Sequence, residues 1–252
     1  MNYVEYGKEN KYDDDIFFQK YSQMSRSQQG LAGAGEWETL RKLLPDFKDK
    51  RVLDLGCGYG WHCIYAMEHG ASSVVGVDIS HKMLEVAKEK THFPQVEYKC
   101  CAIEDVEFPG ESFDVILSSL AFHYVADYEI LVKKIYRILK SGGKLVFTVE
   151  HPVFTAYGTQ DWYYNEKGEI LHFPVDNYYY EGKRTAVFLG EKVTKFHRTL
   201  TTYLNTLLSN GFIINHIVEP QPPEYMMDIP GMQDEMRRPM MLIVSANKKV
   251  DR

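Results

Sequence analysis

Three glycines in the stretch VLDLGCGYGWH are the sharpest chemical signal in this sequence. Gly56, Gly58 and Gly60 lie between a predicted strand, Arg51 to Leu55, and a predicted helix that starts at Trp61. In an open α/β sheet, the loop after the first strand is where a ligand meets backbone amides, and glycines permit positive φ and close approach. The stretch therefore predicts a ligand-binding loop. The alternative is a glycine turn that holds no ligand.

An acidic residue follows at the end of the next predicted strand, Ser73 to Val77. Asp78 stands 18 residues after Gly60, where a carboxylate can accept hydrogen bonds from both ribose hydroxyls of an adenosine ligand. A dinucleotide-binding loop usually has the spacing GxGxxG, whereas this loop has GxGxG followed by Trp61. The two features point to an adenosine cofactor and weaken the nicotinamide alternative.

The elements around this loop alternate between strands and helices. Ser80 and Asp127 are predicted to cap two of the helices, and Ser141 to Gly143 to end the second one. The five runs interpreted as strands are Arg51 to Leu55, Ser73 to Val77, Val96 to Cys100, Phe113 to Ser118 and Lys144 to Val149. Such alternation predicts a parallel sheet covered on both faces.

Before and after this region the pattern differs. Two helices are predicted at the start, from Asp13 to Met24 and from Glu36 to Leu44. Residues 151–198 break the alternation and hold 11 aromatic residues in 48, which predicts a lid over a flat ligand or, alternatively, a small satellite core. A helix from Leu200 to Leu208 and the strands Phe212 to Val218 and Met240 to Ala246 follow.

Four stretches in this order and spacing resemble the class I S-adenosylmethionine-dependent methyltransferases. They are VLDLGCGYG, VVGVDIS, VEYKCCAIEDVEFPGESFDVILSSLAFHYV and ILKSGGKLVFTVEHP. The resemblance implies an α/β fold with a doubly wound, seven-stranded, mostly parallel Rossmann-like sheet, an antiparallel last strand and an aromatic-rich insertion after the fifth strand. We expect a helical cap (1–45), a cofactor-binding core (46–150), a substrate lid (151–198) and the C-terminal part of the sheet (199–252).

The resemblance also implies a cofactor, S-adenosylmethionine, with S-adenosylhomocysteine as product, and assigns its contacts. Many relatives end the third strand in Asp-Ala-Glu, whereas this chain has Ala102, Ile103 and Glu104; backbone contacts to the adenine survive, and a side-chain contact would need Glu104 or Asp105. The methionine part would meet Asp54, Gly56, Cys57, Gly58 and Gly60, the ribose Asp78, and the adenine Ile79 and Met83, with Ser118 contacting the cofactor through its backbone.

Methyl transfer needs a nucleophile in line with the sulfonium methyl and a group that handles the nucleophile's proton. His123 follows the fourth strand, on the loop that faces the methyl group in this family, and is our candidate general base. The alternative is a packed histidine without proton chemistry. The candidate substrate-pocket residues are His151, Trp162, Tyr178, His197 and Arg198, and Tyr163, Tyr164, Tyr179 and Tyr180 would add to the aromatic lid.

Composition limits the classes of molecule that this protein is expected to bind. The 252 residues carry a net charge of −6 with scattered Lys and Arg, which argues against nucleic acid and membrane surfaces. No NPPY-like motif occurs, so we expect O-, N- or C-methylation of a small molecule such as a phenol, enol, carboxylate or amine, by a cytoplasmic monomer or homodimer. The four cysteines have no metal-site spacing, and we assign no metal. A catalytically silent cofactor-binding domain and, less favoured, a nicotinamide oxidoreductase are the alternatives.

Overall fold

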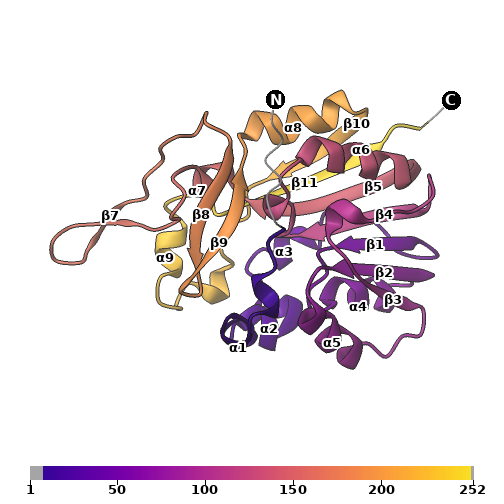
Figure 1. Cartoon of the computed structure of the whole chain (residues 1–252), viewed down its shortest axis with the longest axis horizontal. Coiled ribbons are helices and arrows are strands. Elements are labelled where there is room, and N and C mark those ends of the chain that lie inside the picture. The colour runs from indigo at the N-terminus through magenta and orange to yellow at the C-terminus, as the bar shows by residue number, and fades with distance from the viewer. Residues whose placement is uncertain (1–7, 251–252) are drawn as a thin grey trace.

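The computed structural model describes residues 8–250, and its centre is one seven-stranded sheet (Figure 1). The strand order is β10-β11-β5-β4-β1-β2-β3. The strands are β1 (Arg51–Leu55), β2 (Ser73–Asp78), β3 (Val96–Cys100), β4 (Phe113–Ser119), β5 (Leu139–Glu150), β10 (Phe212–Val218) and β11 (Met241–Lys248). β11 runs antiparallel to both of its neighbours and the other strands share one direction. The predicted doubly wound sheet with an antiparallel last strand is confirmed.

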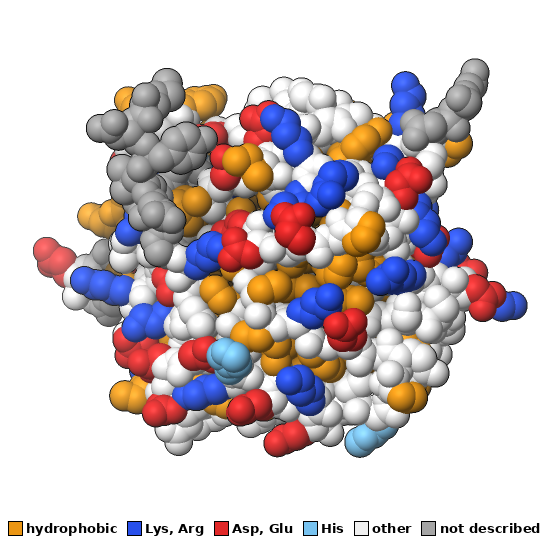
Figure 2. All heavy atoms as spheres, turned by 45° about the vertical axis from the view of Figure 1, so that its right-hand side comes forward, with side chains coloured by type: hydrophobic (Ala, Val, Ile, Leu, Met, Phe, Trp, Pro, Cys, Tyr) orange, Lys and Arg blue, Asp and Glu red, His pale blue; other side chains and the backbone are white. Residues whose placement is uncertain are grey.

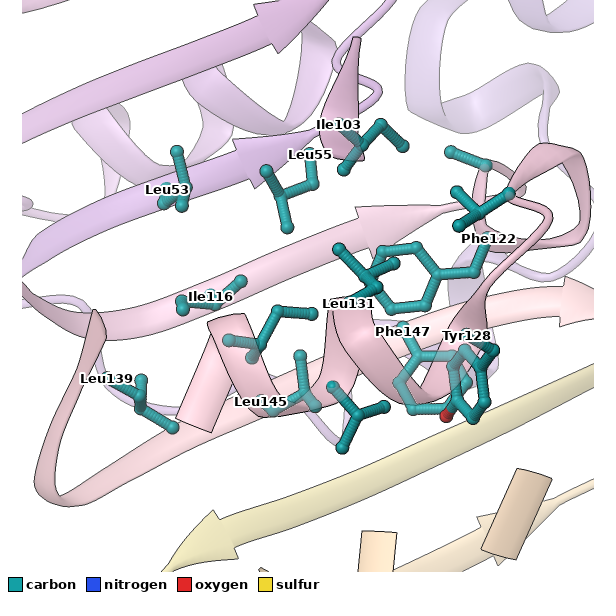
Figure 3. Close-up of a cluster of buried hydrophobic side chains, with 14 of the residues drawn as sticks. Leu53, Leu55, Ile103, Ile116, Phe122, Tyr128, Leu131, Leu139, Leu145 and Phe147 are labelled. Carbon is teal, nitrogen blue, oxygen red and sulfur yellow. The ribbon is translucent and has the colours of Figure 1, made fainter. Parts of the chain in front are cut away.

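Helices cover both faces of this sheet because consecutive side chains of its central strands point to opposite sides and both sides are apolar. On one face, Leu53 packs in a cluster with residues of α6 (Tyr128–Ile138) and α8 (Leu200–Ser209). Figure 3 shows Tyr128 and Leu131 of α6 over the strand residues Ile116 and Phe147. On the other face, Val52 packs with α3 (Trp37–Leu40), α4 (Trp61–Glu68) and α5 (His81–Lys90).

Two predicted helix caps are present, and one predicted helix end is wrong. Ser80 and Asp127 accept the backbone N–H groups of Met83 and Ile130 and so cap α5 and α6. α6, however, ends at Ile138, before the Ser141 to Gly143 stretch that was predicted to stop it. That stretch lies inside β5, where the pairing with β4 shifts from Phe113↔Leu139 to Val115↔Lys144 and Gly142 has a φ of 73°. The glycines therefore accommodate an irregularity in the strand.

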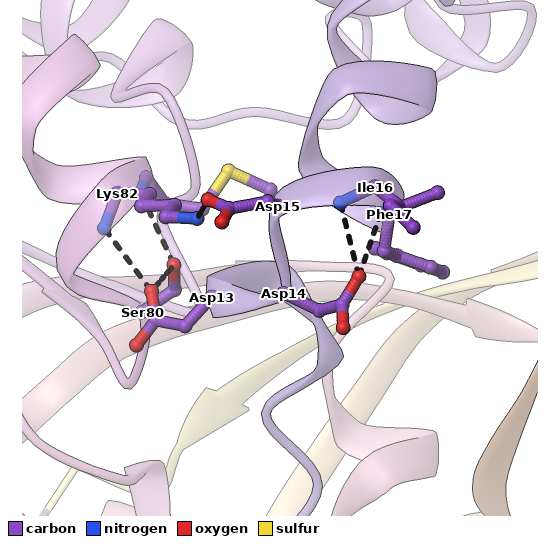
Figure 4. Close-up of polar contacts among 8 residues, drawn as sticks. Asp13, Asp14, Asp15, Ile16, Phe17, Ser80 and Lys82 are labelled. Carbon is purple, nitrogen blue, oxygen red and sulfur yellow. Dashed lines mark hydrogen bonds and ion pairs between the residues drawn. The ribbon is translucent and has the colours of Figure 1, made fainter.

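The chain before β1 forms short helical pieces, two of which lie within the two predicted helices and are shorter than predicted. They are η1 (Lys11–Asp13), α1 (Asp15–Ser22), α2 (Ser25–Gln28), η2 (Gly30–Gly33) and α3. α1 starts at Asp15 because Asp14 Oδ1 accepts the backbone N–H groups of Ile16 and Phe17, as Figure 4 shows. Asp13 Oδ1 accepts Ser80 Oγ–H (2.6 Å) and Lys82 N–H (3.1 Å) and ties this segment to the start of α5.

Residues 151–198 form two hairpins beside the sheet. α7 (Pro152–Ala156) leads to a short hairpin, β6 (Tyr163–Tyr164) and β7 (Ile170–His172), which projects away from the sheet in Figure 1. The longer hairpin, β8 (Gly182–Phe188) and β9 (Glu191–His197), packs against α1 through Phe17, Ala186 and Val193. The remaining elements are η3 (Ile103–Asp105), η4 (Phe122–Tyr124), η5 (Glu224–Met226) and α9 (Met232–Glu235). The longer hairpin and the N-terminal segment thus meet at the carboxyl edge of the sheet.

The surface carries charges of both signs. On the face shown in Figure 2, basic and acidic side chains lie interspersed among apolar ones. No helix among residues 8–250 combines the length and apolar character that crossing a bilayer requires.

Candidate functional site

The glycine loop after β1 is built by close packing and backbone hydrogen bonds. The N–H groups of Gly56 and Cys57 both donate to Val77 O, at 2.8 and 2.9 Å, which joins the loop to the end of β2. Gly60 has a φ of 75°, and a Cβ there would lie 2.2 Å from Tyr98 Oη, so no other residue fits without displacement. At Gly58 (φ of 52°), a Cβ would meet no atom within 4 Å. The loop is therefore closed on its inner side and open beside Gly58.

Asp78 faces this opening. Its Oδ2 accepts the N–H of Gly58 and its Oδ1 accepts the N–H of Ser80, each at 2.9 Å. Burial raises the pKa of this carboxyl group, nearby Asp13 adds to the rise, and the backbone hydrogen bonds oppose it. A carboxylate offers about four acceptor positions, so acceptor capacity remains for a ligand.

A cavity of about 440 Å³ runs along the carboxyl edge of the sheet from this loop. Its volume lies within the range usual for small-molecule sites. At one end it is lined by Gly56, Gly58, Asp78, Ile79, Met83, Ala102, Ile103 and Glu104. At the other end it is lined by His123, Tyr124, Glu150, Phe154, Gln160, Val187, Phe188 and Lys195. The N-terminal segment contributes Tyr12, Tyr21, Met24, Ser25, Arg26 and Glu36.

Eight of the predicted cofactor-binding residues therefore line the cavity, and four lie beside or beneath it. Asp54 is buried under the loop, where Oδ2 accepts Cys63 Sγ–H at 3.5 Å and Oδ1 has no hydrogen-bond partner within residues 8–250. Burial raises the pKa of Asp54 to about 7. Cys57 lines a smaller neighbouring cavity and Gly60 closes the turn. Ser118 Oγ donates to Leu55 O at 2.7 Å and thereby joins β4 to β1.

His123 lines the cavity and has the properties of a hydrogen-bond donor. It is 2% exposed, and its Nδ1 accepts the backbone N–H of Glu150 across a long contact of 3.4 Å. Burial lowers its pKa to about 4, with Lys195 and Arg198 adding to the drop and Glu150 opposing it. The ring is therefore neutral near pH 7, and because Nδ1 accepts, Nε2 carries the hydrogen. This arrangement does not favour the predicted role as general base.

The predicted substrate residues do not line the cavity. His151 Nδ1 caps α7 by accepting Val153 N–H, and its Nε2 lies 2.8 Å from Glu219 Oε1. Trp162 lies against Phe173 and under the guanidinium groups of Arg237 and Arg238. Their environments are structural ones, helix capping and cation–π packing.

The other three predicted substrate residues form hydrogen bonds with backbone groups outside the cavity. Tyr178 Oη accepts Leu200 N–H (3.0 Å), and His197 Nε2–H donates to Tyr178 O (2.9 Å). Arg198 donates to the carbonyl oxygens of Val125 and Ala126, directly after η4. Arg198 therefore holds the loop that carries His123, from behind the cavity wall. Tyr163, Tyr164, Tyr179 and Tyr180 are exposed.

Sequence reasoning missed a polar cluster on the cavity wall. Lys195 Nζ donates to Glu150 Oε1 (2.5 Å) and Gln160 Oε1 (2.8 Å), and Gln160 Nε2 donates to Glu150 Oε2 (2.5 Å). The Lys195 side chain is only 3% exposed. The signal was the alternation of Val193, Lys195 and His197 along β9, which places Lys195 on the buried face.

A second missed pair lies at the opposite end. Arg26 and Glu36 form an ion pair, and Glu36 is 2% exposed. Both side chains line the cavity near the glycine loop. Across residues 8–250, no three His, Cys, Asp or Glu side chains gather in an arrangement that could hold a metal ion.

Comparison with known proteins agrees with this architecture. Residues 53–147 match a methyltransferase domain family. A putative S-adenosylmethionine-dependent methyltransferase from Listeria monocytogenes is 58% identical, covering 87% of this chain and 99% of that one with a TM-score of 0.84. An S-adenosylmethionine-dependent methyltransferase from Mesorhizobium loti is 40% identical, covering 87% and 100% of the two chains with a TM-score of 0.80.

A third relative matches over less than half of the chain. The ubiquinone biosynthesis O-methyltransferase of Coxiella burnetii is 36% identical over 112 residues, which are 44% of this chain and 47% of that enzyme. This chain thus spans about half the length of that relative. The two structural relatives match over almost their whole length. The chain belongs to the class I S-adenosylmethionine-dependent methyltransferases.

Proposed function

We propose that this enzyme transfers the methyl group of S-adenosylmethionine to a small molecule bound at the His123 end of the cavity. The observation that carries the proposal is the cavity itself, which continues from Asp78 to Lys195. Both the N-terminal segment and the β8–β9 hairpin contribute to its walls, so a macromolecular acceptor would have to displace them. The Coxiella burnetii relative, an O-methyltransferase named for ubiquinone biosynthesis, supports an acceptor of this size class.

The residues at the other end fit the cofactor. Space remains beside Gly58, Asp78 has free acceptor capacity, and the buried Asp54 Oδ1 has no partner within the described chain. Asp78 would accept hydrogen bonds from the ribose hydroxyl groups. Ile79 and Met83 would flank the adenine, and Ala102, Ile103 and Glu104 would lie along its edge. The glycine loop and Asp54 would face the methionine part, whose ammonium group suits an orphaned carboxylate oxygen.

The chain's own contribution to the reaction is binding, orientation and exclusion of water. When bound, S-adenosylmethionine supplies an electrophilic methyl group. Because that group is already activated, the protein needs mainly to hold the acceptor in line with it. His123 would donate Nε2–H to the acceptor and fix its position. Arg198 keeps the His123 loop in place through its bonds to Val125 and Ala126.

We also infer that successive segments of the chain have different roles. Within residues 1–45, the described part would act as a cap over the cofactor. Residues 46–150 would form the cofactor-binding core, and residues 151–198 would close the acceptor end through Phe154, Gln160 and the β8–β9 hairpin. Residues 199–252 complete the sheet with β10 and β11.

A labelling experiment tests the acceptor class. The purified enzyme is incubated with methyl-labelled S-adenosylmethionine and either a small-metabolite extract, nucleic acid or protein from the same cells. We expect label in the small-metabolite fraction and calorimetric binding of S-adenosylhomocysteine. Label that enters only protein or nucleic acid would contradict the proposal. Tight cofactor binding with no transfer to any fraction would instead support a catalytically silent domain.

A further inference from the structure

The acceptor end of the cavity carries a buried charged cluster whose hydrogen-bonding atoms are unequally used. Both carboxylate oxygens of Glu150 accept hydrogen bonds, Oε1 from Lys195 and Oε2 from Gln160. An ammonium group has three donors, and Lys195 uses two of them, on Glu150 and Gln160, within residues 8–250. The cluster therefore offers a ligand a donor on Lys195 more readily than an acceptor on Glu150.

A second donor comes from the neighbouring loop. The backbone N–H of Glu150 occupies Nδ1 of His123, which leaves Nε2–H as the free polar group of that ring. Within the described chain, no partner is found for Nε2. Glu150 thus holds both groups, Lys195 with its side chain and His123 with its backbone.

The other charged groups near this end do not change which hydrogen-bond donors are free for a ligand. Arg198 lies behind the wall on backbone carbonyl oxygens, and Glu9 Oε2 accepts Thr194 N–H at 2.5 Å. The positive charges of Lys195 and Arg198 balance the negative charges of Glu150 and Glu9. The hydroxyl groups of Tyr12 and Tyr124 hydrogen-bond to each other at 3.3 Å, and burial raises the pKa of both, so they stay neutral. Selectivity must therefore come from the free donors.

The rest of this end is apolar and partly aromatic. Phe154, Val187, Phe188, Met240 and Met241 line it, and Lys195 Nζ lies 5.4 Å from the centre of the Phe188 ring. Walls of this kind suit a flat hydrophobic body. Lys195 and His123 both line this end of the cavity, and two hydrogen-bond donors in one wall suit an oxygen atom on that body.

We propose that the acceptor is a planar molecule with an acidic hydroxyl group, a phenol or enol. It binds as its anion, with the oxygen between Lys195 Nζ and His123 Nε2–H. This inference rests on the proposed function. The acid proton leaves to solvent on binding, so no general base is needed. A lone pair of the oxygen forms the bond to the methyl carbon, the carbon–sulfur bond breaks, and its electron pair stays on sulfur as the neutral thioether.

The test uses 4-nitrophenol as probe, because its anion and its neutral form have different absorption spectra. The wild-type enzyme, saturated with S-adenosylhomocysteine, is titrated with the probe across its ionisation range. We expect the anion to bind at least about tenfold more tightly than the neutral form, which lowers the apparent pKa of the bound probe by one or more. Binding of the neutral form alone would overturn the proposal.

Two variants give expectations of opposite sign, and a third is their control. Lys195→Met removes the cation and should weaken anion binding by about tenfold or more, whereas Glu150→Gln leaves the cation without its counter-charge and should tighten it. Lys192→Met, on the exposed side of the same strand, is the matched control and should change nothing. If the cationic probe benzylamine binds instead, and the first two variants shift it in the reverse order, the acceptor is an amine and the inference fails.

Folding and cofactor binding are checked separately. Lys195→Met leaves a buried carboxylate unpaired, so Lys195→Met/Glu150→Gln is made as well and should bind 4-nitrophenol without preference for the anion. S-adenosylhomocysteine affinity, measured by calorimetry, should stay within about threefold of wild type in each variant. Wild-type enzyme that failed to bind S-adenosylhomocysteine would contradict the proposed function. Normal cofactor binding with no anion preference in wild type would overturn only this inference.

Discussion

The carboxylate of Asp78 accepts a hydrogen bond from the backbone N–H of Gly58 at 2.9 Å, and so connects the end of β2 to the middle of the glycine loop. The same carboxylate accepts the N–H of Ser80 at the start of α5. One side chain thereby orders the two segments that would surround the cofactor's ribose. Its role in binding and its role in shaping the loop are linked.

Asp78→Asn should weaken cofactor binding about tenfold to a hundredfold, because the amide NH₂ cannot accept from either a ribose hydroxyl or a backbone N–H and hydrogen bonds to a charged group are worth about 1.5 to 3 kcal/mol. Calorimetry with S-adenosylhomocysteine measures the change. Glu85→Gln, on the exposed side of α5, is the control and should leave the affinity unaltered. An Asp78→Asn affinity within threefold of wild type would count against this placement of the ribose.

His123→Phe should lower kcat/KM by about tenfold to a hundredfold through loss of a donor to a charged oxygen. The pH dependence between pH 6 and 9 should keep its shape, because burial holds the pKa of His123 at about 4, below that window. Cofactor affinity should stay unchanged. His92→Phe, at an exposed position, serves as control. A wild-type rate that rises with a midpoint near neutrality, and a variant that lacks this rise, would establish His123 as the general base after all.

The glycine loop, Asp78 and the sheet could be predicted because each depends on a local pattern. The spacing of the three glycines predicted the tight turn in which Gly60 has a positive φ, and the position of Asp78 at the end of a predicted strand placed it beside this turn. The alternation of strands and helices indicated the parallel sheet, and the family resemblance implied its antiparallel last strand. Arg198 was predicted to line the substrate pocket, but its guanidinium donates to backbone carbonyl groups and does not line the cavity.

The acceptor end of the cavity could not be predicted from the sequence, because its residues come from segments that are far apart along the chain and meet only in the folded structure. Glu150 ends β5, Gln160 lies in a loop and Lys195 lies on β9, 45 residues after Glu150. Aromatic density in residues 151–198 suggested a lid, yet Tyr179 is 88% exposed in the connection between β7 and β8, so composition alone does not decide which side chains face the site. Long-range packing of this kind leaves no periodic signal in one sequence.

Asp13→Ala should weaken S-adenosylhomocysteine binding about fivefold to thirtyfold, because it removes the two hydrogen bonds that tie the N-terminal segment to Ser80 and Lys82 (Figure 4). Hydrogen bonds from Ser80, Asn10 and Lys82 outweigh the opposing effect of burial and lower the pKa of Asp13. The contact therefore persists at neutral pH and is lost only as the pH falls through that lowered value.

Asp15→Ala is the matched control for Asp13→Ala. Asp15 pairs with the same Lys82, but its side chain is 96% exposed, and exposed ion pairs contribute little. Calorimetry near pH 7.5 should therefore separate the two variants. Equal effects would indicate that Lys82, and not the tie to Ser80, controls the cap.

Asp54 makes the stability of the ligand-free enzyme depend on pH. Burial raises its pKa from 3.8 to about 7, so the native state keeps a proton that the unfolded chain has already lost between those values. Stability therefore falls as pH rises from about 4 to about 7, by on the order of 4 kcal/mol. Above pH 7 both states are ionised and the cost is constant.

Asp54→Asn removes this titration and should show it directly. Relative to wild type, the variant's free energy of unfolding should rise between pH 4 and pH 7 and level off above, because only the wild type loses stability there. Urea unfolding at a series of pH values measures the difference, with Asp228→Asn as an exposed control. Saturating S-adenosylhomocysteine should shrink the rise, because a cationic ammonium group bound above the loop would favour the ionised form of Asp54 and lower its pKa. A difference that stayed flat with pH would mean that Asp54 is ionised in the native protein well below pH 7, so that its free oxygen already has a partner.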